Sequence, residues 1–383
     1  MSAQQFPNVA APAGHDDARF MAAALNYGRR NMGMAAPNPS VGAIIVRNDG
    51  EPVIIARGVT AKGGRPHAET EALKIAGDAA KGATVYVTLE PCAHQSKTPP
   101  CASALIRAEV GRVVIAIEDP NPLVSGNGIR MLRDAGIEAI VGIGAAQAKI
   151  DHAGHFRRVR DGRPHILLKI AVSADGKTGL EGRKPARISG AVSTAEAHIL
   201  RATCDAILVG SGTVLADNPS LDCRLPGMEE RSPIRVVLDG NLRIPLESRL
   251  VETAQQRKLI VIAGEDAPAD AENTLMQRGV EVVRVPCRRD RHRKMMLDDA
   301  MQELGKRGIT RLLVEGGPML SASLLQNDLV DEAVVVQAPV VLGAGAIDAI
   351  EGLPLDALLA SPRLATIEKR VLGNDQMIRL FRK

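Results

Sequence analysis

The stretch EPCAHQSKTPPC, residues 90–101, holds two of the chain's five cysteines, Cys92 and Cys101, at the ends of a proline-rich loop. It follows an apolar run, ATVYVTL (83–89), that is typical of a strand, and it leads into the helical pattern of 101–111. Upstream, His67-Ala68-Glu69 opens another helical segment, 67–77. Strands that alternate with helices predict an α/β layer with helices on the faces of the sheet.

His67, Cys92 and Cys101 are ligand types that zinc prefers, and a catalytic zinc site keeps its fourth tetrahedral position for water. We expect the three ligands to come from two neighbouring helix starts, whose positive ends favour thiolate. Zinc lowers the pKa of bound water to about 7. Glu69 is placed to take a proton from that water and pass it to a leaving amine. The pattern therefore predicts one Zn²⁺ per chain, with Glu69 as the catalytic residue.

Two other interpretations of this loop compete with a catalytic zinc site. A lone cysteine pair would favour inert, buried thiols, but the upstream H-x-E and the P-C after a strand match the signature of zinc nucleobase deaminases. A purely structural zinc would leave Glu69 without a task. The loop departs from the usual signature because eight residues, not two, separate Cys92 from Cys101.

The length of 383 residues predicts two or three domains. A first alternating series of helices and strands fills 15–147, polarity rises over a junction at 148–163, and a second series fills 164–383. The first 14 residues have no such pattern, and we expect a disordered tail there. The expected fold class is α/β in both domains.

Composition excludes several classes of protein. The 48 basic and 44 acidic residues nearly balance, and the chain has no Trp, two Tyr and four Phe, which disfavours a nucleic-acid binder. No apolar run reaches the roughly 18 residues of a membrane helix. Five unevenly spaced cysteines argue against a disulfide framework and for a reducing cytoplasm.

Two glycine turns follow apolar strands in the second half. VGSGTVLADNP (209–219) and VEGGPML (314–320) each run from a strand into a helix, where backbone N–H groups can bind phosphate. A Rossmann pattern fails because Leu215 stands in place of the third glycine. Two such turns are consistent with a dinucleotide cleft, or with tight loops alone.

The longer motifs identify a resemblance. PCAHQSKTPPC, with NPSVGAIIV (38–46), GGRPHAE (63–69) and EDPNPLVSGNGI (118–129), resembles the pyrimidine deaminases of riboflavin biosynthesis. LKIAVSADGK (168–177), LRATCDAILVGSGTVLADNPSL (200–221) and LLVEGGPML (312–320) are similar to the reductase domain of the bifunctional enzymes of that family. The resemblance spans about nine-tenths of the chain. It implies a cytidine-deaminase-like domain followed by a dihydrofolate-reductase-like domain.

By that resemblance the first domain removes the 2-amino group of a phosphoribosyl pyrimidine by hydrolysis, and the second uses NADPH to reduce the ribosyl unit to a ribityl chain. The resemblance implies a homodimer through the reductase domain, and it implies no nucleic-acid or membrane partner. The implied substrate contacts are Asn38, Asp119, Asn121, Lys169, Ser189, Arg201, Asn218, Leu221, Arg224 and Glu315. The implied NADPH contacts are Ser173, Asp175, Gly210, Gly212, Thr213, Gly316 and Gly317.

Two positions depart from the family pattern. Thr60 stands where some members have a histidine, and Arg187 stands where the family often has a tryptophan. These departures leave open an interpretation in which only the deaminase is active. A nucleic-acid-editing deaminase and a non-catalytic zinc or nucleotide sensor are further alternatives. The few aromatic residues argue against the first and the intact Glu69 against the second.

Overall fold

The computed structural model describes residues 15–94, 99–181, 186–287 and 295–383. The chain divides into two compact units, Met1–Asp161 and Gly162–Lys383. Within the predicted junction, 148–163, residues 148–151 and 153–161 are helical, and the predicted domain bounds stay a prediction. The predicted disordered tail, 1–14, lies outside the described residues. No helix within the described ranges is long and apolar enough to cross a membrane.

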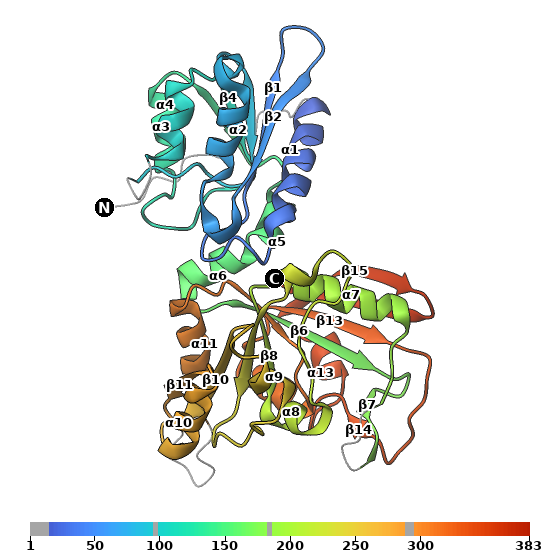
Figure 1. Cartoon of the computed structure of the whole chain (residues 1–383). Helices are drawn as coiled ribbons and strands as arrows, with labels where there is room; N and C mark the ends of the chain where they lie inside the picture. Colours follow the sequence, from blue (N-terminus) through green and yellow to red (C-terminus); the bar gives the residue numbers. More distant parts are fainter. Residues whose placement is uncertain (1–14, 95–98, 182–185, 288–294) are drawn as a thin grey trace, which may run out of the picture. The chain divides into compact units, whose positions relative to one another are not determined.

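The first unit is a sheet between two helical layers (Figure 1). Its strands lie in the order β2-β1-β3-β4-β5, with β1 antiparallel to β2 and β3, and with β3, β4 and β5 mutually parallel. In chain order its elements are α1 (His15–Gly28), β1 (Gly42–Arg47), β2 (Val53–Val59), α2 (Ala68–Ala76), β3 (Thr84–Val87), α3 (Cys101–Arg107), β4 (Arg112–Ile115), α4 (Asn127–Asp134), β5 (Glu138–Val141), α5 (Ala145–Asp151) and α6 (Ala153–Asp161).

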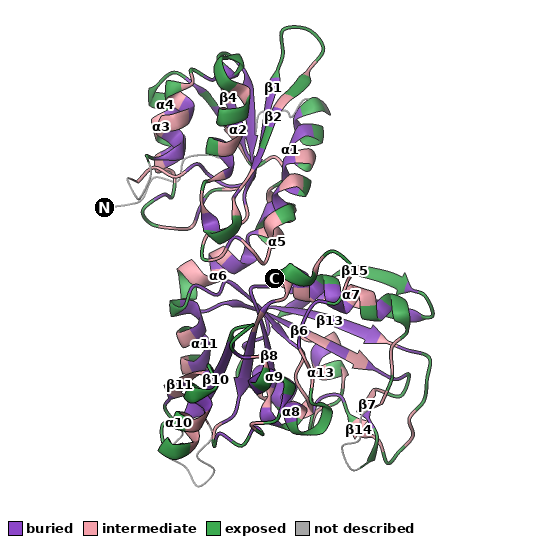
Figure 2. Ribbon diagram, viewed as in Figure 1, coloured by how far each residue is buried: buried purple, intermediate pink, exposed green. Residues whose placement is uncertain are grey.

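Each face of this sheet has its own core. Alternate side chains of a strand point to opposite faces, so Ile45 of β1 packs with α2, α3 and α4, whereas Ile44 and Val46 pack with α1 and α5. The central strands β1, β3 and β4 are therefore buried on both sides, as Figure 2 shows. This explains why they read in the sequence as continuous apolar runs.

The second unit contains a nine-stranded sheet in the order β11-β10-β9-β8-β12-β6-β13-β16-β15, and a small β14-β7 pair. In this order, all strands from β11 through β10, β9, β8, β12 and β6 to β13 are mutually parallel. β16 is antiparallel to both of its neighbours, β13 and β15. In chain order its elements are β6 (His165–Val172), β7 (Lys177–Gly179), α7 (Ala191–Ala202), β8 (Ala206–Gly210), α8 (Ser211–Asp217), β9 (Ile234–Leu238), α9 (Arg249–Glu252), β10 (Leu259–Gly264), α10 (Ala269–Gln277), β11 (Glu281–Val285), α11 (Leu297–Lys306), β12 (Arg311–Val314), α12 (Pro318–Gln326), β13 (Glu332–Gln337), β14 (Ile347–Asp348), α13 (Asp356–Leu359), β15 (Leu364–Leu372) and β16 (Asp375–Arg382).

The parallel strands of this sheet match the second series expected from the sequence. The C-terminal hairpin, β15 and β16, was not predicted from the sequence. Most of β15 faces solvent, and the run Glu368-Lys369-Arg370 interrupts its apolar residues. An edge strand with charged side chains is a common way to prevent edge-to-edge association, and it weakens the apolar signal that identifies a strand.

Buried ion pairs tie the start of β13 to the start of β6. Asp331, whose side chain is fully buried, accepts from Arg163 Nη1 and Nη2 at 2.6 and 3.0 Å and from the backbone N–H of Ile166 at 3.0 Å. The next residue, Glu332, is also fully buried and lies 2.9 Å from Nε2 of His165. Arg163 neutralises the Asp331 carboxylate, whereas Arg311 and Arg379 neutralise that of Glu332, and breaking such a pair would leave a buried charge.

Asp331→Asn should lower the free energy of unfolding of the second unit by about 3–5 kcal/mol, because it leaves the buried Arg163 guanidinium without a counter-charge. Hydrogen exchange of the amides in β6 and β13 measures the loss. Asp328→Asn is the control. Asp328 also pairs with arginines, but its side chain is 43% exposed, so the expected loss is below about 1 kcal/mol. Equal losses in the two variants would contradict the importance of the buried pair.

Candidate functional site

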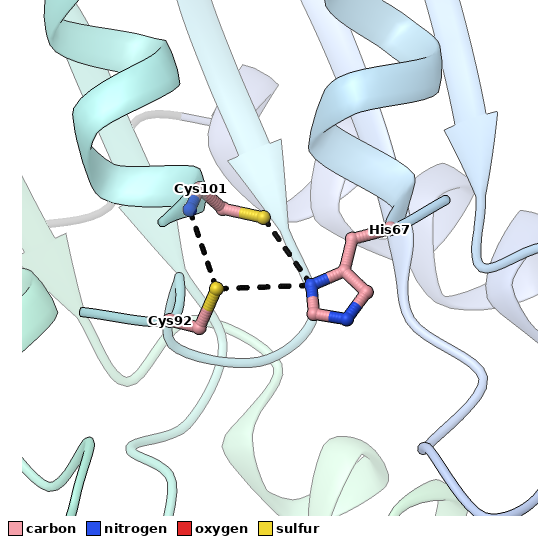
Figure 3. A group of neighbouring side chains, drawn as sticks. All are labelled: His67, Cys92 and Cys101. Carbon is pink, nitrogen blue, oxygen red and sulfur yellow. Dashed lines mark hydrogen bonds between the residues drawn. The ribbon is translucent and has the colours of Figure 1, made fainter. Parts of the chain in front are cut away.

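Three potential metal ligands meet in the first unit (Figure 3). Nδ1 of His67 lies 3.7 Å from Sγ of Cys92 and 3.3 Å from Sγ of Cys101, and the three ligand atoms lie within 4.8 Å of one another. A tetrahedral zinc ion with bonds of about 2.0 Å to nitrogen and about 2.3 Å to sulfur separates such atoms by about 3.5 Å. The donor set and the distances therefore fit zinc.

The protonation of the two thiols differs. The backbone N–H of Cys101, the first residue of α3, donates to Sγ of Cys92 at 3.2 Å. Hydrogen bonds from the Cys101 thiol and from His67 outweigh burial and lower the pKa of Cys92 to about 4. The Cys92 thiolate and burial raise the pKa of Cys101. Cys92 is thus a thiolate, and Cys101 would supply the second sulfur ligand once its proton is lost.

The sequence predicted that all three ligands come from helix starts, and this is wrong for one of them. His67 caps the N-terminus of α2 and Cys101 begins α3, but Cys92 lies in the loop between β3 and α3. Its thiolate is favoured by the N-terminus of α3, which begins nine residues later in the chain. The helix field therefore acts on Cys92 through space.

Glu69 lies on the first turn of α2 beside the ligands and is buried, with 4% of its surface exposed. Burial raises the pKa of its carboxyl to about 7. A carboxyl that titrates near neutral pH can both accept and donate a proton. The side chain lines the same cavity as His67 and Cys92.

This cavity, of about 150 Å³, brings together the predicted deaminase residues. Asn38, Glu69, Asp119 and Asn121 line it along with two of the ligands. Asn38 Nδ2 lies 3.3 Å from Nε2 of His67 and donates to the carbonyl of Gly64 at 2.8 Å. Asn38 therefore binds the Gly64 backbone with its amide and faces the cavity beside the imidazole of His67.

Glu90 holds one wall of the cavity in place. Its buried carboxylate accepts from the backbone N–H groups of Asp119 (3.3 Å), Gly126 (3.0 Å), Gly128 (2.9 Å) and Ile129 (3.3 Å). β3 and β4 are neighbouring parallel strands, so the residues after their carboxyl ends meet at one edge. Glu90 joins these two segments, and it stands two residues before Cys92.

Thr60, one of the two departures from the family pattern, also lines this cavity. Its hydroxyl accepts from the backbone N–H of Val41 at 2.9 Å, and 1% of its surface is exposed. The hydroxyl therefore connects β2 to the segment before β1.

A second cavity, of about 560 Å³, lies in the second unit. β8 and β12 are parallel neighbours, so their two glycine turns end side by side, and the backbone N–H of Glu315 donates to the carbonyl of Leu208 at 3.1 Å. Seven predicted residues line the cavity: Lys169, Gly210, Gly212, Thr213, Glu315, Gly316 and Gly317. A volume of this order suits an extended small-molecule ligand.

Arg201 uses its donors within the protein. Nε and Nη2 donate to the Glu315 carboxylate at 2.8 and 2.7 Å, and Nη1 donates to the carbonyl of Asp222 at 2.9 Å. Burial alone would raise the pKa of Glu315, but Arg201 outweighs it and holds that pKa below its usual value. In this structure Arg201 therefore acts on the cavity through Glu315, and a direct contact to a substrate phosphate stays a prediction.

Other predicted residues of the second unit lie apart from this cavity. Ser173 donates to Asp175 at 2.6 Å, and Asp175 accepts from the backbone N–H groups of Leu342 and Gly343. Ser189 lines a separate cavity beside Asp375. Asn218 follows the last residue of α8 in a left-handed conformation, and the buried Leu221 and the half-exposed Arg224 come next. The expected roles of these residues stay predictions: Ser173, Asp175, Ser189, Asn218, Leu221 and Arg224.

Several cavity residues were missed by the sequence analysis. Arg65, His94 and His155 line the first cavity, and Nδ1 of His94 is buried without a hydrogen-bond partner in the part of the chain that the structure describes. Arg243 lines the second cavity and donates to Ser211 at 2.9 Å. His94 lies within the opening motif and could have been singled out, whereas His155 and Arg243 carried no local signal.

Comparison with known families agrees with both sites. Residues 15–117 match the cytidine and deoxycytidylate deaminase zinc-binding region, and residues 164–378 match the RibD C-terminal domain. The zinc-binding match covers His67, Cys92 and Cys101, the ligands that the structure brings together. The expected order of a cytidine-deaminase-like unit and a reductase-like unit is confirmed.

Full-length relatives extend the match to the whole chain. The chain is 37% identical to the riboflavin biosynthesis protein RibD of Aquifex aeolicus, with 94% of this chain and 97% of the relative covered, and 37% identical to that of Escherichia coli, with 95% and 99% covered. Among solved structures, RibD of Acinetobacter baumannii superposes with a TM-score of 0.83 at 34% identity, and the coverage is 96% of this chain and 99% of that one. A Thermotoga maritima diaminohydroxyphosphoribosylaminopyrimidine deaminase/5-amino-6-(5-phosphoribosylamino)uracil reductase superposes with a TM-score of 0.80 at 30% identity, with the same coverage. The chain belongs to the RibD family of riboflavin biosynthesis proteins.

Proposed function

We propose that this chain catalyses two consecutive steps of riboflavin biosynthesis. The first unit deaminates the phosphoribosyl diaminopyrimidine, and the second reduces the ribosyl unit of the resulting 5-amino-6-(5-phosphoribosylamino)uracil to a ribityl chain. The observation that carries the proposal is the His67, Cys92 and Cys101 cluster with Glu69 beside it in one cavity, in a chain that matches bifunctional relatives over nearly its full length.

In the first unit, zinc held by His67, Cys92 and Cys101 would supply the Lewis acidity that activates water. Glu69 takes the proton from that water and passes it to the leaving amino group; its buried position and neutral-range pKa suit both transfers. Asn38, Asp119 and Asn121 face the cavity as contacts for the pyrimidine and its substituents. Deamination of this kind consumes water and releases ammonia.

In the second unit, NADPH would supply the hydride. Gly210, Gly212 and Thr213 at the start of α8, and Gly316 and Gly317 before α12, line a cavity in which backbone can approach phosphate closely. Lys169 and Glu315 line the same cavity; Lys169 is a proposed contact for the phosphate of the substrate and Glu315 for its sugar chain. The family resemblance further predicts a homodimer through this unit and a cytoplasmic location.

Mass spectrometry of the products tests both activities at once. The phosphoribosyl diaminopyrimidine is incubated with the zinc-loaded chain, with and without NADPH. We expect loss of the amine without NADPH, and a gain of two hydrogens only with it. Deamination without reduction would support the alternative in which the second unit is degenerate. An unchanged substrate in both incubations would contradict the proposal.

Cys101→Ser should remove most of the bound zinc, because a serine hydroxyl replaces one of the two sulfur ligands. Metal analysis after dialysis against a weak chelator should find about one zinc per chain in the unaltered protein and much less in the variant. Cys287→Ser, at a free cysteine of the second unit, is the matched control and should keep its zinc. Unchanged zinc in Cys101→Ser would exclude Cys101 as a ligand.

Glu69→Gln should lower kcat for deamination by about 10²–10⁴-fold, because the amide cannot carry a proton between water and the leaving group. Zinc content and the reduction of directly supplied 5-amino-6-(5-phosphoribosylamino)uracil should stay at the level of the unaltered chain. A variant that deaminates at the unaltered rate would show that another group moves the proton.

Gly210→Val should raise the Kd for NADPH about tenfold or more without destabilising the protein. The backbone of Gly210 is in an ordinary extended conformation (φ −83°), and a Cβ there has no atom within 4 Å, so valine fits the free protein but occupies the cavity. Calorimetric titration of NADPH measures the change. Gly50→Val, at an equally open position in the first unit, should bind NADPH normally. Normal binding by Gly210→Val would place the cofactor elsewhere.

A further inference from the structure

His155 contributes an imidazole to the first cavity from an unexpected element. It lies on α6, and its side chain is 10% exposed. Nε2 of His155 lies 2.9 Å from Oδ1 and 3.1 Å from Oδ2 of Asp119, which is itself nearly buried. Because a carboxylate only accepts, the imidazole donates this hydrogen bond from Nε2. Both residues line the cavity that contains Glu69 and two of the zinc ligands.

The contacts of Asp119 differ between its two oxygens. Among the residues that the structure describes, Oδ1 accepts from the backbone N–H of Asn121 at 2.8 Å and from His155 at 2.9 Å, whereas Oδ2 has only the longer, 3.1 Å contact with His155. A carboxylate oxygen can accept two hydrogen bonds. Oδ2 therefore keeps an acceptor site for a further donor, and the bonds to Oδ1 fix the direction in which Oδ2 points.

His155 differs from its neighbour on α6. Phe156 belongs to the hydrophobic core, with its ring centroid 6.1 Å from that of His155. His155 is not part of that core, and its polar contact is with Asp119, 36 residues earlier in the chain. The backbone N–H of Asp119 donates to the Glu90 carboxylate at 3.3 Å. Glu90 fixes the main chain of this residue, which leaves the orientation of its carboxylate to His155 and the N–H of Asn121.

We propose that His155 is a positioning residue of the deaminase: it orients the Asp119 carboxylate so that Oδ2 accepts a hydrogen bond from an N–H or O–H group of the substrate. The inference rests on the proposed deaminase function of this cavity and adds a residue from outside the zinc-binding motifs. His155 acts through Asp119, so it contributes to substrate binding more than to the chemical step. A hydrogen bond between a charged acceptor and a substrate is among the stronger ones.

Steady-state kinetics of the zinc-loaded full-length chain tests this role. His155→Phe keeps a ring of similar size beside Phe156 but removes the donor, and it should raise KM for deamination about tenfold while kcat falls less than about threefold. His155→Gln keeps an N–H donor and should recover most of the loss in KM. Bound zinc and the reductase rate on directly supplied 5-amino-6-(5-phosphoribosylamino)uracil should equal those of the unaltered chain in both variants.

A double-mutant cycle with Asp119→Asn separates positioning from general structure. If His155 acts through Asp119, His155→Phe should raise KM little further once Asp119→Asn is present. Additive effects, an unaltered KM in His155→Phe, no recovery in His155→Gln, or a loss of zinc would each overturn the role of His155. Absence of deamination by the unaltered chain would instead overturn the proposed function, and this inference with it.

Discussion

The buried carboxylate of Glu90 is the contact on which the deaminase cavity depends. It accepts hydrogen bonds from four backbone N–H groups of the segment that follows β4, while its own main chain leads directly into Cys92. Buried donors and acceptors must be satisfied. This single side chain therefore holds the segment that carries Cys92, after β3, against the segment that carries Asp119, after β4. The metal ligands and the substrate-facing residues thereby come to share one cavity.

Both units use the same geometric rule. Parallel strands end at the same edge of a sheet, and the loops that leave neighbouring strands are brought together there. In the first unit the rule joins the loops after β3 and β4, which carry the thiolate Cys92 and the carboxylate Asp119. In the second it joins the glycine turns after β8 and β12. One edge therefore holds polar, ionisable groups, and the other exposes backbone suited to phosphate.

Several polar and charged side chains in or near these cavities have partners within the protein. Arg201 pairs with Glu315, Ser173 and Asp175 bond to each other, and the Thr60 hydroxyl accepts from Val41. A ligand in the second cavity would therefore meet the Glu315 carboxylate and the glycine turns directly, and Arg201 through Glu315. For Thr60, the departure from the family pattern leaves a hydroxyl that connects two segments of the first unit. An imidazole nevertheless reaches the same cavity from α6, through His155.

The sequence by itself determined the α/β class of both units, the zinc ligand set and the two glycine turns. Apolar runs mark strands that are buried on both faces. The H-x-E and P-C patterns are specific for a zinc site in their residue types and spacing. Only the tertiary structure decided that Cys92 lies in a loop rather than at a helix start, that Arg201 binds Glu315, and that His155 meets Asp119. Arg201 and Glu315 stand 114 residues apart, and His155 and Asp119 stand 36 apart. Local patterns report which face of an element is buried, whereas pairs at such separations arise only when the sheet brings its connecting segments together.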